Sequence, residues 1–156
     1  MPYNEQVSGV EIRPALPGER SSLEALQWRA SLANSGDRDS LLANPDAIAL
    51  AVEQIADGHV FVAQQDGVIV GFAAVLTRPD GNAELDALFV EPTLWKRGVG
   101  RLLVEHCAEV ARQRASRILH VVGNPHAKGF YAACGFLTTG AVETRFGAGL
   151  AMQRAL

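Results

Sequence analysis

The amino-acid sequence predicts a mixed α/β domain built on a sheet, and three observations support this. Apolar residues recur at helical spacing in the first third of the chain, as at Leu23, Leu26 and Ala30. Runs rich in β-forming residues then follow one another across two turn signals, Asp66-Gly67 and "PDGN". Helical and strand patterns alternate from there to the C-terminus. Such a succession is typical of a sheet covered by helices.

The first half of the chain is expected to form one strand and two helices. Ser21 or Ser22 is a suitable N-cap for the first helix. Asn44 and Pro45 open the second helix, and Gly58 ends it. The expected elements are a strand at 10–15, a helix from about 21 to 34, a polar loop at 35–43 and a helix at 46–58.

The second half is expected to begin with three consecutive strands and to end with two more. The strand at 83–92 has apolar residues on both faces, which is typical of a central strand. The expected elements are strands at 59–65, 68–78 and 83–92, a helix at 99–115, a strand at 117–122, a short helix at 125–135, and strands at 136–146 and 149–156.

Length and charge limit the classes of function. The chain has 156 residues, of which 48% are hydrophobic and 20% charged, and its formal net charge is -3. We therefore expect one domain over residues 1–156, with enough apolar material for a core. A weakly acidic chain offers no general surface for nucleic acid or for an anionic membrane. Neither is an expected partner, and any anion site must be a local cluster.

The remaining composition favours a cytoplasmic protein. The start, "MPYNEQVSGVEIRP", has no cationic region followed by an apolar one, and no apolar run approaches the roughly 20 residues that span a bilayer. Cys107 and Cys134 form no CxxC pair, which suits a reducing compartment. The four histidines, at strand, helix and loop positions, have no metal-type spacing, so no metal is expected.

The segment "EPTLWKRGVGRLL", residues 91–103, joins the central strand to the long helix. Gly98 and Gly100 allow an anion to approach the backbone, and the first helical turn carries a partial positive charge of about half an elementary charge. Lys96, Arg97 and Arg101 add full charges. The segment therefore predicts a phosphate site, with an ordinary tight turn and solvated arginines as the alternative.

Two common nucleotide motifs do not fit this segment. A dinucleotide fingerprint requires a third glycine at the position of Leu103. A P-loop requires Gly-Lys-Ser or Gly-Lys-Thr, and the chain contains neither.

The sequence instead resembles the GNAT superfamily of acetyl-CoA-dependent N-acetyltransferases in two motifs. Members carry L-x-V-x-P on the central strand and then Q/R-x-x-G-x-G/A, matched here by Leu88, Val90, Pro92 and "WKRGVG". Their later N-x-x-A-x-x-F-Y-x-x-x-G-F segment is matched by Asn124, Ala127, Phe130, Tyr131, Gly135 and Phe136. The resemblance extends from about Val10 to the C-terminus. Trp95 departs from it, because the family usually has Gln or Arg there, and Lys96 and Arg97 would share the task of holding the pyrophosphate.

The resemblance implies a central mixed, mostly antiparallel sheet of about seven strands, flanked by about four helices and opened between strands 4 and 5. Acetyl-CoA would be the cosubstrate, with its pantetheine arm in this opening. The backbone amide of Val90 would face the thioester carbonyl as an oxyanion donor. The cofactor-binding residues that the resemblance implies are Leu88, Phe89, Val90, Trp95, Lys96, Arg97, Gly98, Val99, Gly100, Arg101, Asn124, Ala127, Lys128, Phe130 and Tyr131.

The implied reaction needs a proton acceptor and a proton donor. An alkylamine with a pKa of roughly 10.4 is almost entirely protonated at neutral pH and must lose a proton before it attacks. Glu84, thirteen residues before Arg97, resembles the catalytic glutamate of histone-type members in its spacing, and Asp86 or a water chain is the alternative base. Tyr131 matches the family tyrosine that protonates the departing thiolate. The structural alternatives are a carboxylate at a strand start and a packed ring.

The expected acceptor is a primary amine of a small molecule or a peptide. In the family, the loop between the first two helices and the turn between the last two strands wall the acceptor site. Here Asp37 and Asp39 would attract a cationic amine, whereas Arg38 and Arg145 would hold a carboxylate, so the charges select no substrate. O-acyl transfer and a homodimer stay open. So does an acyl-CoA-binding module without turnover, although the presence of both Glu84 and Tyr131 argues against it.

Overall fold

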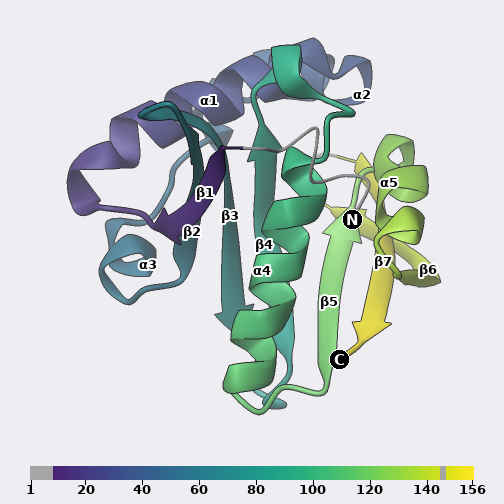
Figure 1. Ribbon diagram of the computed structural model, residues 1–156. Coiled ribbons are helices and arrows are strands. Elements are labelled where there is room, and N and C mark those ends of the chain that lie inside the picture. Colours follow the sequence, from purple (N-terminus) through teal and green to yellow (C-terminus); the bar gives the residue numbers. More distant parts are fainter. Residues whose placement is uncertain (1–8, 145–146) are drawn as a thin grey trace. The chain divides into compact units, whose positions relative to one another are not determined.

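Seven strands form one sheet in the computed structural model, which describes residues 9–144 and 147–156 (Figure 1). The strand order is β1-β2-β3-β4-β5-β7-β6, with β4 and β5 parallel. The ladder between β4 and β5 runs only from the Ala83–Leu119 pair to the Leu85–Val121 pair. This confirms the predicted mixed, mostly antiparallel sheet that opens between strands 4 and 5. The strands are β1 (Val10–Pro14), β2 (Val60–Gln65), β3 (Val68–Thr77), β4 (Ala83–Val90), β5 (Ile118–Gly123), β6 (Leu137–Thr144) and β7 (Gly147–Ala155).

Five α-helices accompany the sheet within the described residues, one more than expected. None of these helices has the length and apolar character that crossing a membrane requires. The predicted long and short helices of the second half are confirmed as α4 and α5. The helices are α1 (Arg20–Ala33), α2 (Ser35–Ala43), α3 (Val52–Ala56), α4 (Val99–Gln113) and α5 (Lys128–Ala133).

Neither Ser21 nor Ser22 caps α1, so that prediction is wrong. The helix begins at Arg20, directly after a 3-10 turn at Pro17–Glu19, and both serines therefore lie inside it. Glu19 occupies the N-terminal position instead. Its carboxylate accepts the backbone N–H of Leu16 at 2.8 Å and thereby closes the turn that starts the helix.

The segment 35–43 is helix α2 rather than the predicted polar loop. Leu41 is 6% exposed whereas Leu42 is 54% exposed. Among residues 37–43, the part of α2 whose burial is described, only Leu41 is deeply buried, so no apolar spacing repeats and the pattern indicates a polar segment. The side-chain amide of Asn44 donates to the backbone oxygen of Ser40 at 2.9 Å, at the end of the helix.

The predicted helix at 46–58 is interrupted. A 3-10 turn covers Pro45–Ala47, and α3 begins only at Val52. Between them Leu50 is buried, and its backbone N–H donates to the carboxylate of Glu24 on α1 at 2.8 Å. This tertiary contact withdraws the N–H from helical bonding, so the chain forms two short pieces.

The chain divides into two compact units. Unit 1 comprises the residues up to Ala74 together with Ala87–His106. Unit 2 comprises Val75–Asp86 together with Cys107–Leu156. The single domain over residues 1–156 stays a prediction.

In unit 1, helix α1 packs against strands β2 and β3 (Figure 1). Leu23 and Leu26 of α1 are buried in one cluster with Val62 of β2 and Phe72 of β3. Removing each such side chain from water contributes roughly 1.5–3 kcal/mol. Phe89 of β4 is partly buried against the same cluster, with its ring 5.5 Å from that of Phe72. The core thus supports the end of β4 from which the predicted phosphate loop departs.

In unit 2, two side chains hold the starts of β4 and β5 together. The side-chain oxygen of Asn82 accepts the backbone N–H of Arg117 at 3.1 Å and that of Ile118 at 3.2 Å. The hydroxyl of Ser116 also donates to the backbone oxygen of Gly81 at 3.2 Å. Because these bonds join the residues just before β4 to those just before β5, they fix the register of the parallel pair.

Candidate functional site

The predicted phosphate loop of unit 1 lies between the end of β4 and the start of α4. Val99, the first residue of α4, is 3% exposed and anchors the helix. Lys96 has a φ of 64° and Gly98 a φ of 94°, so the backbone passes twice through the left-handed region, which is rare for a lysine. The side chains of Trp95, Lys96 and Arg97 are exposed. The loop thus presents two cations and ends at a helix N-terminus, an arrangement that favours an anion.

Trp95 has a structural role at this loop. Its indole Nε1 donates to the backbone oxygen of Val90 at 2.8 Å. The next N–H along the chain, that of Glu91, donates to the backbone oxygen of Val70 on β3 at 2.8 Å. The peptide group between Val90 and Glu91 is therefore bonded on both sides. The residue that departs from the family pattern fixes the end of β4.

Glu91 ties the same loop to α1. Its carboxylate accepts two hydrogen bonds from the guanidinium of Arg29, at 3.0 and 2.8 Å. The pKa of Glu91 is lowered, chiefly by this hydrogen bonding, and the pKa of Arg29 is raised by it. These hydrogen bonds keep Glu91 ionised and paired with Arg29.

Gly71 allows β3 and β4 to approach closely in unit 1. A Cβ atom at Gly71 would lie 3.0 Å from the backbone oxygen of Phe89 and 3.1 Å from Cδ1 of Leu103. A methyl group would fit only if these neighbours moved by a few tenths of an ångström. The backbone of Phe89 and Val90, which the family resemblance assigns to cofactor binding, is therefore positioned by a glycine that the sequence analysis did not single out.

In unit 2, Tyr131 lies on α5 with its ring packed against β5. The residue is 8% exposed, and a Cβ at Gly123 would lie 3.0 Å from its Cε2 atom. The rings of Phe130 and Phe136 contact it edge-on, with centroids 5.1 and 5.5 Å away. Burial raises the pKa of the phenol, and the nearby thiol of Cys134 raises it further. Tyr131 therefore keeps its proton throughout the neutral range.

The rest of the second motif surrounds this tyrosine. The side-chain oxygen of Asn124, just after β5, accepts the backbone N–H of His126 at 2.9 Å and caps the turn before α5. Lys128 and Phe130 are exposed, the latter by 37%, and Ala127 is half-buried. The second motif therefore forms one local structure, in which the Asn124 cap, helix α5 and the ring of Tyr131 stabilise one another.

Glu84 and Asp86 alternate with buried neighbours on β4. Ala83 and Leu85 are 2% and 3% exposed, whereas Glu84 is half-buried and Asp86 is exposed. The two carboxylates therefore lie on the less buried face of this part of β4, as their spacing predicted. The register partner of Glu84 on β5 is His120, one of the four histidines whose spacing predicted no metal site.

The predicted site residues fall into two local sets. Asp37, Arg38 and Asp39 lie on helix α2, which replaces the expected acceptor loop, and Arg145 lies outside the described residues. Unit 1 holds Leu88, Phe89, Val90, Trp95, Lys96, Arg97, Gly98, Val99, Gly100 and Arg101, and unit 2 holds Glu84, Asn124, Ala127, Lys128, Phe130 and Tyr131. In the part of the chain that the structure describes, no three His, Cys, Asp or Glu side chains are arranged to hold a metal ion.

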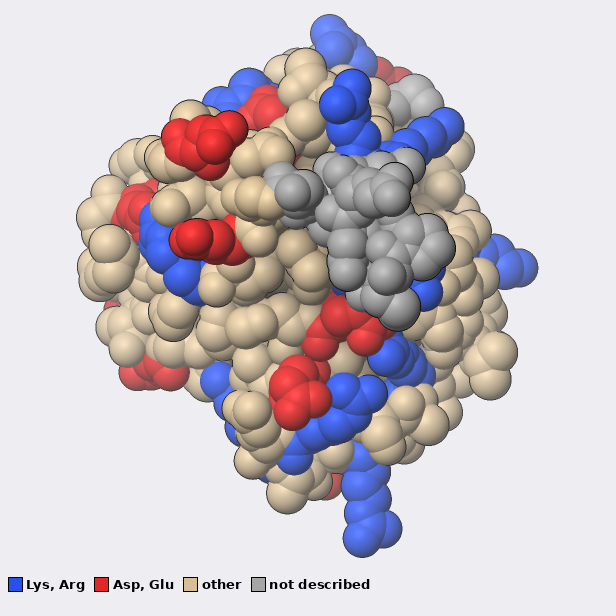
Figure 2. Space-filling model, in the orientation of Figure 1, with Lys and Arg blue, Asp and Glu red and all other residues tan. Residues whose placement is uncertain are grey.

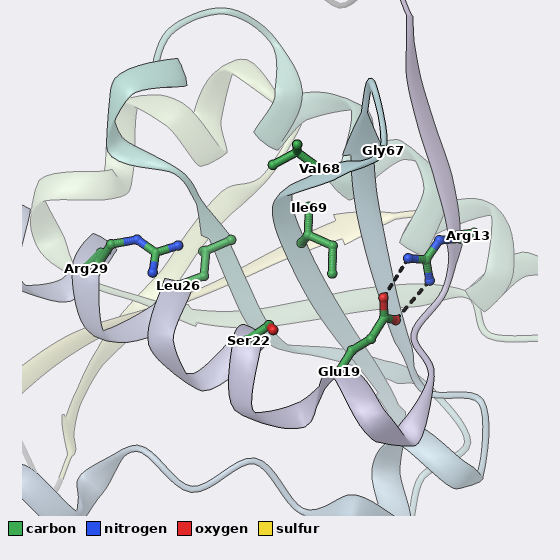
Figure 3. A pocket seen from close by; sticks show the side chains of 8 residues that line it. All are labelled: Arg13, Glu19, Ser22, Leu26, Arg29, Gly67, Val68 and Ile69. Carbon is green, nitrogen blue, oxygen red and sulfur yellow. Dashed lines mark hydrogen bonds and ion pairs between the residues drawn. The ribbon is translucent and has the colours of Figure 1, made fainter.

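A separate hollow of about 300 Å³ lies in unit 1 between α1, β1 and the start of β3 (Figure 3). Its walls include Arg13 and Arg29, yet each guanidinium already binds a carboxylate. Arg13 bonds Glu19 at 2.9 and 2.7 Å, and Arg29 bonds Glu91. Leu26 and Ile69 supply apolar surface. None of the predicted site residues lines this hollow.

Charge on the visible face is mixed rather than concentrated. Figure 2 shows basic and acidic side chains in small groups of both signs over this face. Anion binding on this face would therefore depend on local geometry rather than on a broad basic surface.

Known proteins resemble this chain in sequence and in fold. The model of the acetyltransferase (GNAT) family matches residues 22–136. A peptidyl-lysine N-acetyltransferase, YjaB of Salmonella typhimurium, is 30% identical over 135 residues, which are 86% of this chain and 88% of the relative. A GCN5-related N-acetyltransferase from Rhodopseudomonas palustris superposes with a TM-score of 0.76 at 24% identity, over 96% of this chain and 97% of that one. The paia N-acetyltransferase of Thermoplasma acidophilum, solved in complex with coenzyme A, superposes with a TM-score of 0.74 at 16% identity, over 94% and 99% of the two chains.

Proposed function

Because the chain belongs to the acetyltransferase (GNAT) family and is an acetyl-CoA-dependent N-acetyltransferase, we propose that it acetylates a primary amine by direct attack on the thioester. The amine nitrogen bonds to the thioester carbon, the C–S bond breaks, and coenzyme A leaves as a thiolate. The observation that carries this proposal is the position of Tyr131 within the family motif, where its ring is buried against β5 and its phenol keeps its proton at neutral pH.

The donor would be held by the residues that the resemblance names. Lys96 and Arg97, with Arg101 in the first turn of α4, would balance the charge of the pyrophosphate. The amides of Gly98 and Gly100 and the start of α4 would bind its oxygens. Leu88, Phe89 and Val90 would bond the pantetheine arm through their backbone, and the Val90 N–H would stabilise the oxyanion.

Glu84 and Tyr131 would manage the protons. Glu84, or Asp86 on the same face, would take the proton that the acceptor ammonium must lose. Tyr131 would protonate the departing thiolate, whose ordinary pKa near 8.5 makes this help useful without being essential. Asn124, Ala127, Lys128 and Phe130 would contact the cofactor from their motif.

The acceptor we propose is the side-chain amine of a lysine in a peptide, with small-molecule amines as the second class. The support is the peptidyl-lysine acetyltransferase that is 30% identical to this chain. Cytoplasmic localisation and assembly as a homodimer remain predictions.

Thiol release from acetyl-CoA with a panel of amines tests the proposal. The panel should include lysine peptides, polyamines, aminoglycosides and amino acids, with alcohols as O-acyl acceptors. We expect release that depends on an amine, and a rise in melting temperature with acetyl-CoA. A ligand at about 100 times its dissociation constant adds roughly 2.7 kcal/mol to stability.

Two negative outcomes of this experiment would have different meanings. Stabilisation by acetyl-CoA without turnover on any amine would support a binding module instead. The cofactor assignment would be wrong if millimolar acetyl-CoA left the melting temperature unchanged.

A further inference from the structure

Three polar side chains form a row across neighbouring strands of unit 2. Glu84 on β4 is the register partner of His120 on β5, and His120 is the register partner of Gln153 on β7. Register partners lie on the same face of a sheet, and adjacent strands are about 4.8 Å apart. Leu119 and Val121, on either side of His120, are 0% and 3% exposed. The imidazole therefore lies on the opposite, less buried face, beside the carboxylate of Glu84.

The charges around His120 come from two elements. Arg78 and Asp80 lie in the turn between β3 and β4, and Glu84 lies on β4, whereas Gln153 on β7 is neutral. Burial lowers the pKa of His120, Arg78 lowers it further, and Asp80 and Glu84 raise it. The imidazole is therefore neutral at neutral pH and has a carboxylate beside it to stabilise its protonated form.

We propose that His120 is a further residue of the proton path, which accepts the proton of the acceptor ammonium through a chain of water molecules while Glu84 stabilises the resulting imidazolium. This inference rests on the proposed amine acetylation and refines it, because the base becomes a Glu84–His120 pair. The ammonium N–H bond breaks, its electron pair stays on nitrogen for the attack, and the proton bonds to the imidazole. The imidazolium then returns the proton to solvent.

The proton affinities of the two groups support this division of labour. An alkylammonium has a pKa of roughly 10.4, an imidazole about 6.5 and a glutamate about 4.3 in their ordinary forms. Transfer to an imidazole is therefore less unfavourable than transfer to a carboxylate. Burial lowers the pKa of His120 and so makes the imidazole a weaker proton acceptor. The negative charge of Glu84 raises this pKa and offsets part of the effect of burial.

Titration of the His120 imidazole by NMR tests the pair without any acceptor. The His120 signal is assigned by its absence in His120→Gln and followed from pH 4.5 to 9 in the parent and in Glu84→Gln. We expect the pKa of His120 to fall in Glu84→Gln, because a stabilising negative charge is lost. The control Glu109→Gln removes an exposed carboxylate of α4 in the same unit and should leave the pKa of His120 unchanged. An unchanged titration in Glu84→Gln overturns the pairing.

The pH dependence of acetyl transfer to a lysine peptide, or to whichever panel amine the parent acetylates, tests the catalytic role. The rising limb of kcat/KM should have its midpoint at the pKa measured for His120. His120→Gln should lose that limb and about 100-fold of kcat near neutral pH, with unchanged acetyl-CoA affinity. His59→Gln in unit 1 is the matched histidine control and should keep the parent profile. Retention of the parent rate and limb in His120→Gln overturns the role, whereas a parent that acetylates no amine contradicts the proposed function instead.

Discussion

The indole Nε1 of Trp95 lies 2.8 Å from the backbone oxygen of Val90 and donates a hydrogen bond to it. The bond connects the phosphate loop to the last residue of β4, whose N–H is the proposed oxyanion donor. Trp95 does not match the family motif, yet it stabilises the backbone of β4 on which the matching residues lie.

Trp95→Phe should weaken acetyl-CoA binding by about fivefold, because a net hydrogen-bond contribution of about 1 kcal/mol to the loop geometry is lost while an aromatic ring is kept. Isothermal titration calorimetry measures the change. Trp28→Phe, on α1 of the same unit, is the matched control and should bind like the parent. Equal affinity of Trp95→Phe and the parent would show that the bond does not position the loop.

Arg97→Glu should weaken coenzyme A at least tenfold and pantetheine hardly at all, because only coenzyme A carries the pyrophosphate that meets the reversed charge. Arg117→Glu is an exposed charge reversal in unit 2 and serves as the control. Competition against acetyl-CoA gives both affinities. A similar loss for coenzyme A and pantetheine would indicate a damaged fold rather than a lost phosphate contact.

Tyr131→Phe should lower turnover while acetyl-CoA affinity changes less than about threefold, because the ring and its packing remain and only the proton donor is lost. The deficit should grow at alkaline pH, where solvent protonates a thiolate poorly. Steady-state kinetics from pH 6 to 10, combined with calorimetry, separate the two effects. Loss of affinity in proportion to rate would identify Tyr131 as a packing residue.

Gly71→Ala should destabilise the fold by about 1–3 kcal/mol, because the new methyl group would lie 3.0 Å from the backbone oxygen of Phe89. Urea unfolding measures the free-energy difference. Gly18→Ala adds the same atoms where no heavy atom lies within 4 Å and should change stability little. Equal stability of the two variants would contradict the close approach of β3 and β4.

Alkaline pH should destabilise the fold through Cys107. Burial raises the pKa of its thiol to about 12, so the folded protein keeps the proton after the unfolded chain begins to lose it near pH 8.5. Because the folded pKa is the higher one, this contribution is complete below about pH 8.5 and is lost between there and about pH 12. Urea unfolding from pH 7.5 to 10.5 should show a slope that Cys107→Ala reduces. An identical slope in both proteins would contradict the assignment.

Local chemistry accounts for much of what the sequence predicted correctly. The Asp66-Gly67 turn places φ values of 51° and 78° between β2 and β3, so a two-residue signal sufficed for that hairpin. The amphipathic pattern of α4 and the doubly apolar strand β4 likewise depend on neighbouring residues alone. The two family motifs also correspond to local structures, namely the loop before α4 and the turn before α5.

Tertiary contacts explain what sequence reasoning missed. The bond from Leu50 to Glu24 interrupts a helix that looked continuous. Among the residues of α2 whose burial is described, only Leu41 is deeply buried, so no apolar period appears. The pairing of Glu84 with His120 depends on a parallel register that no connecting turn encodes. Asn82 sets that register from outside both strands, so spacing alone gives no signal for His120.

Burial of both thiols has a practical consequence for measuring the reaction. Cys107 is 0% and Cys134 is 4% exposed. Thiol-reactive dyes, which need an accessible thiolate, should therefore leave the folded chain unlabelled. In the thiol-release experiment the fast colour then comes from coenzyme A alone. A slow rise in colour without acetyl-CoA would measure the molecules that have unfolded. One dye would therefore report turnover and unfolding on separate timescales.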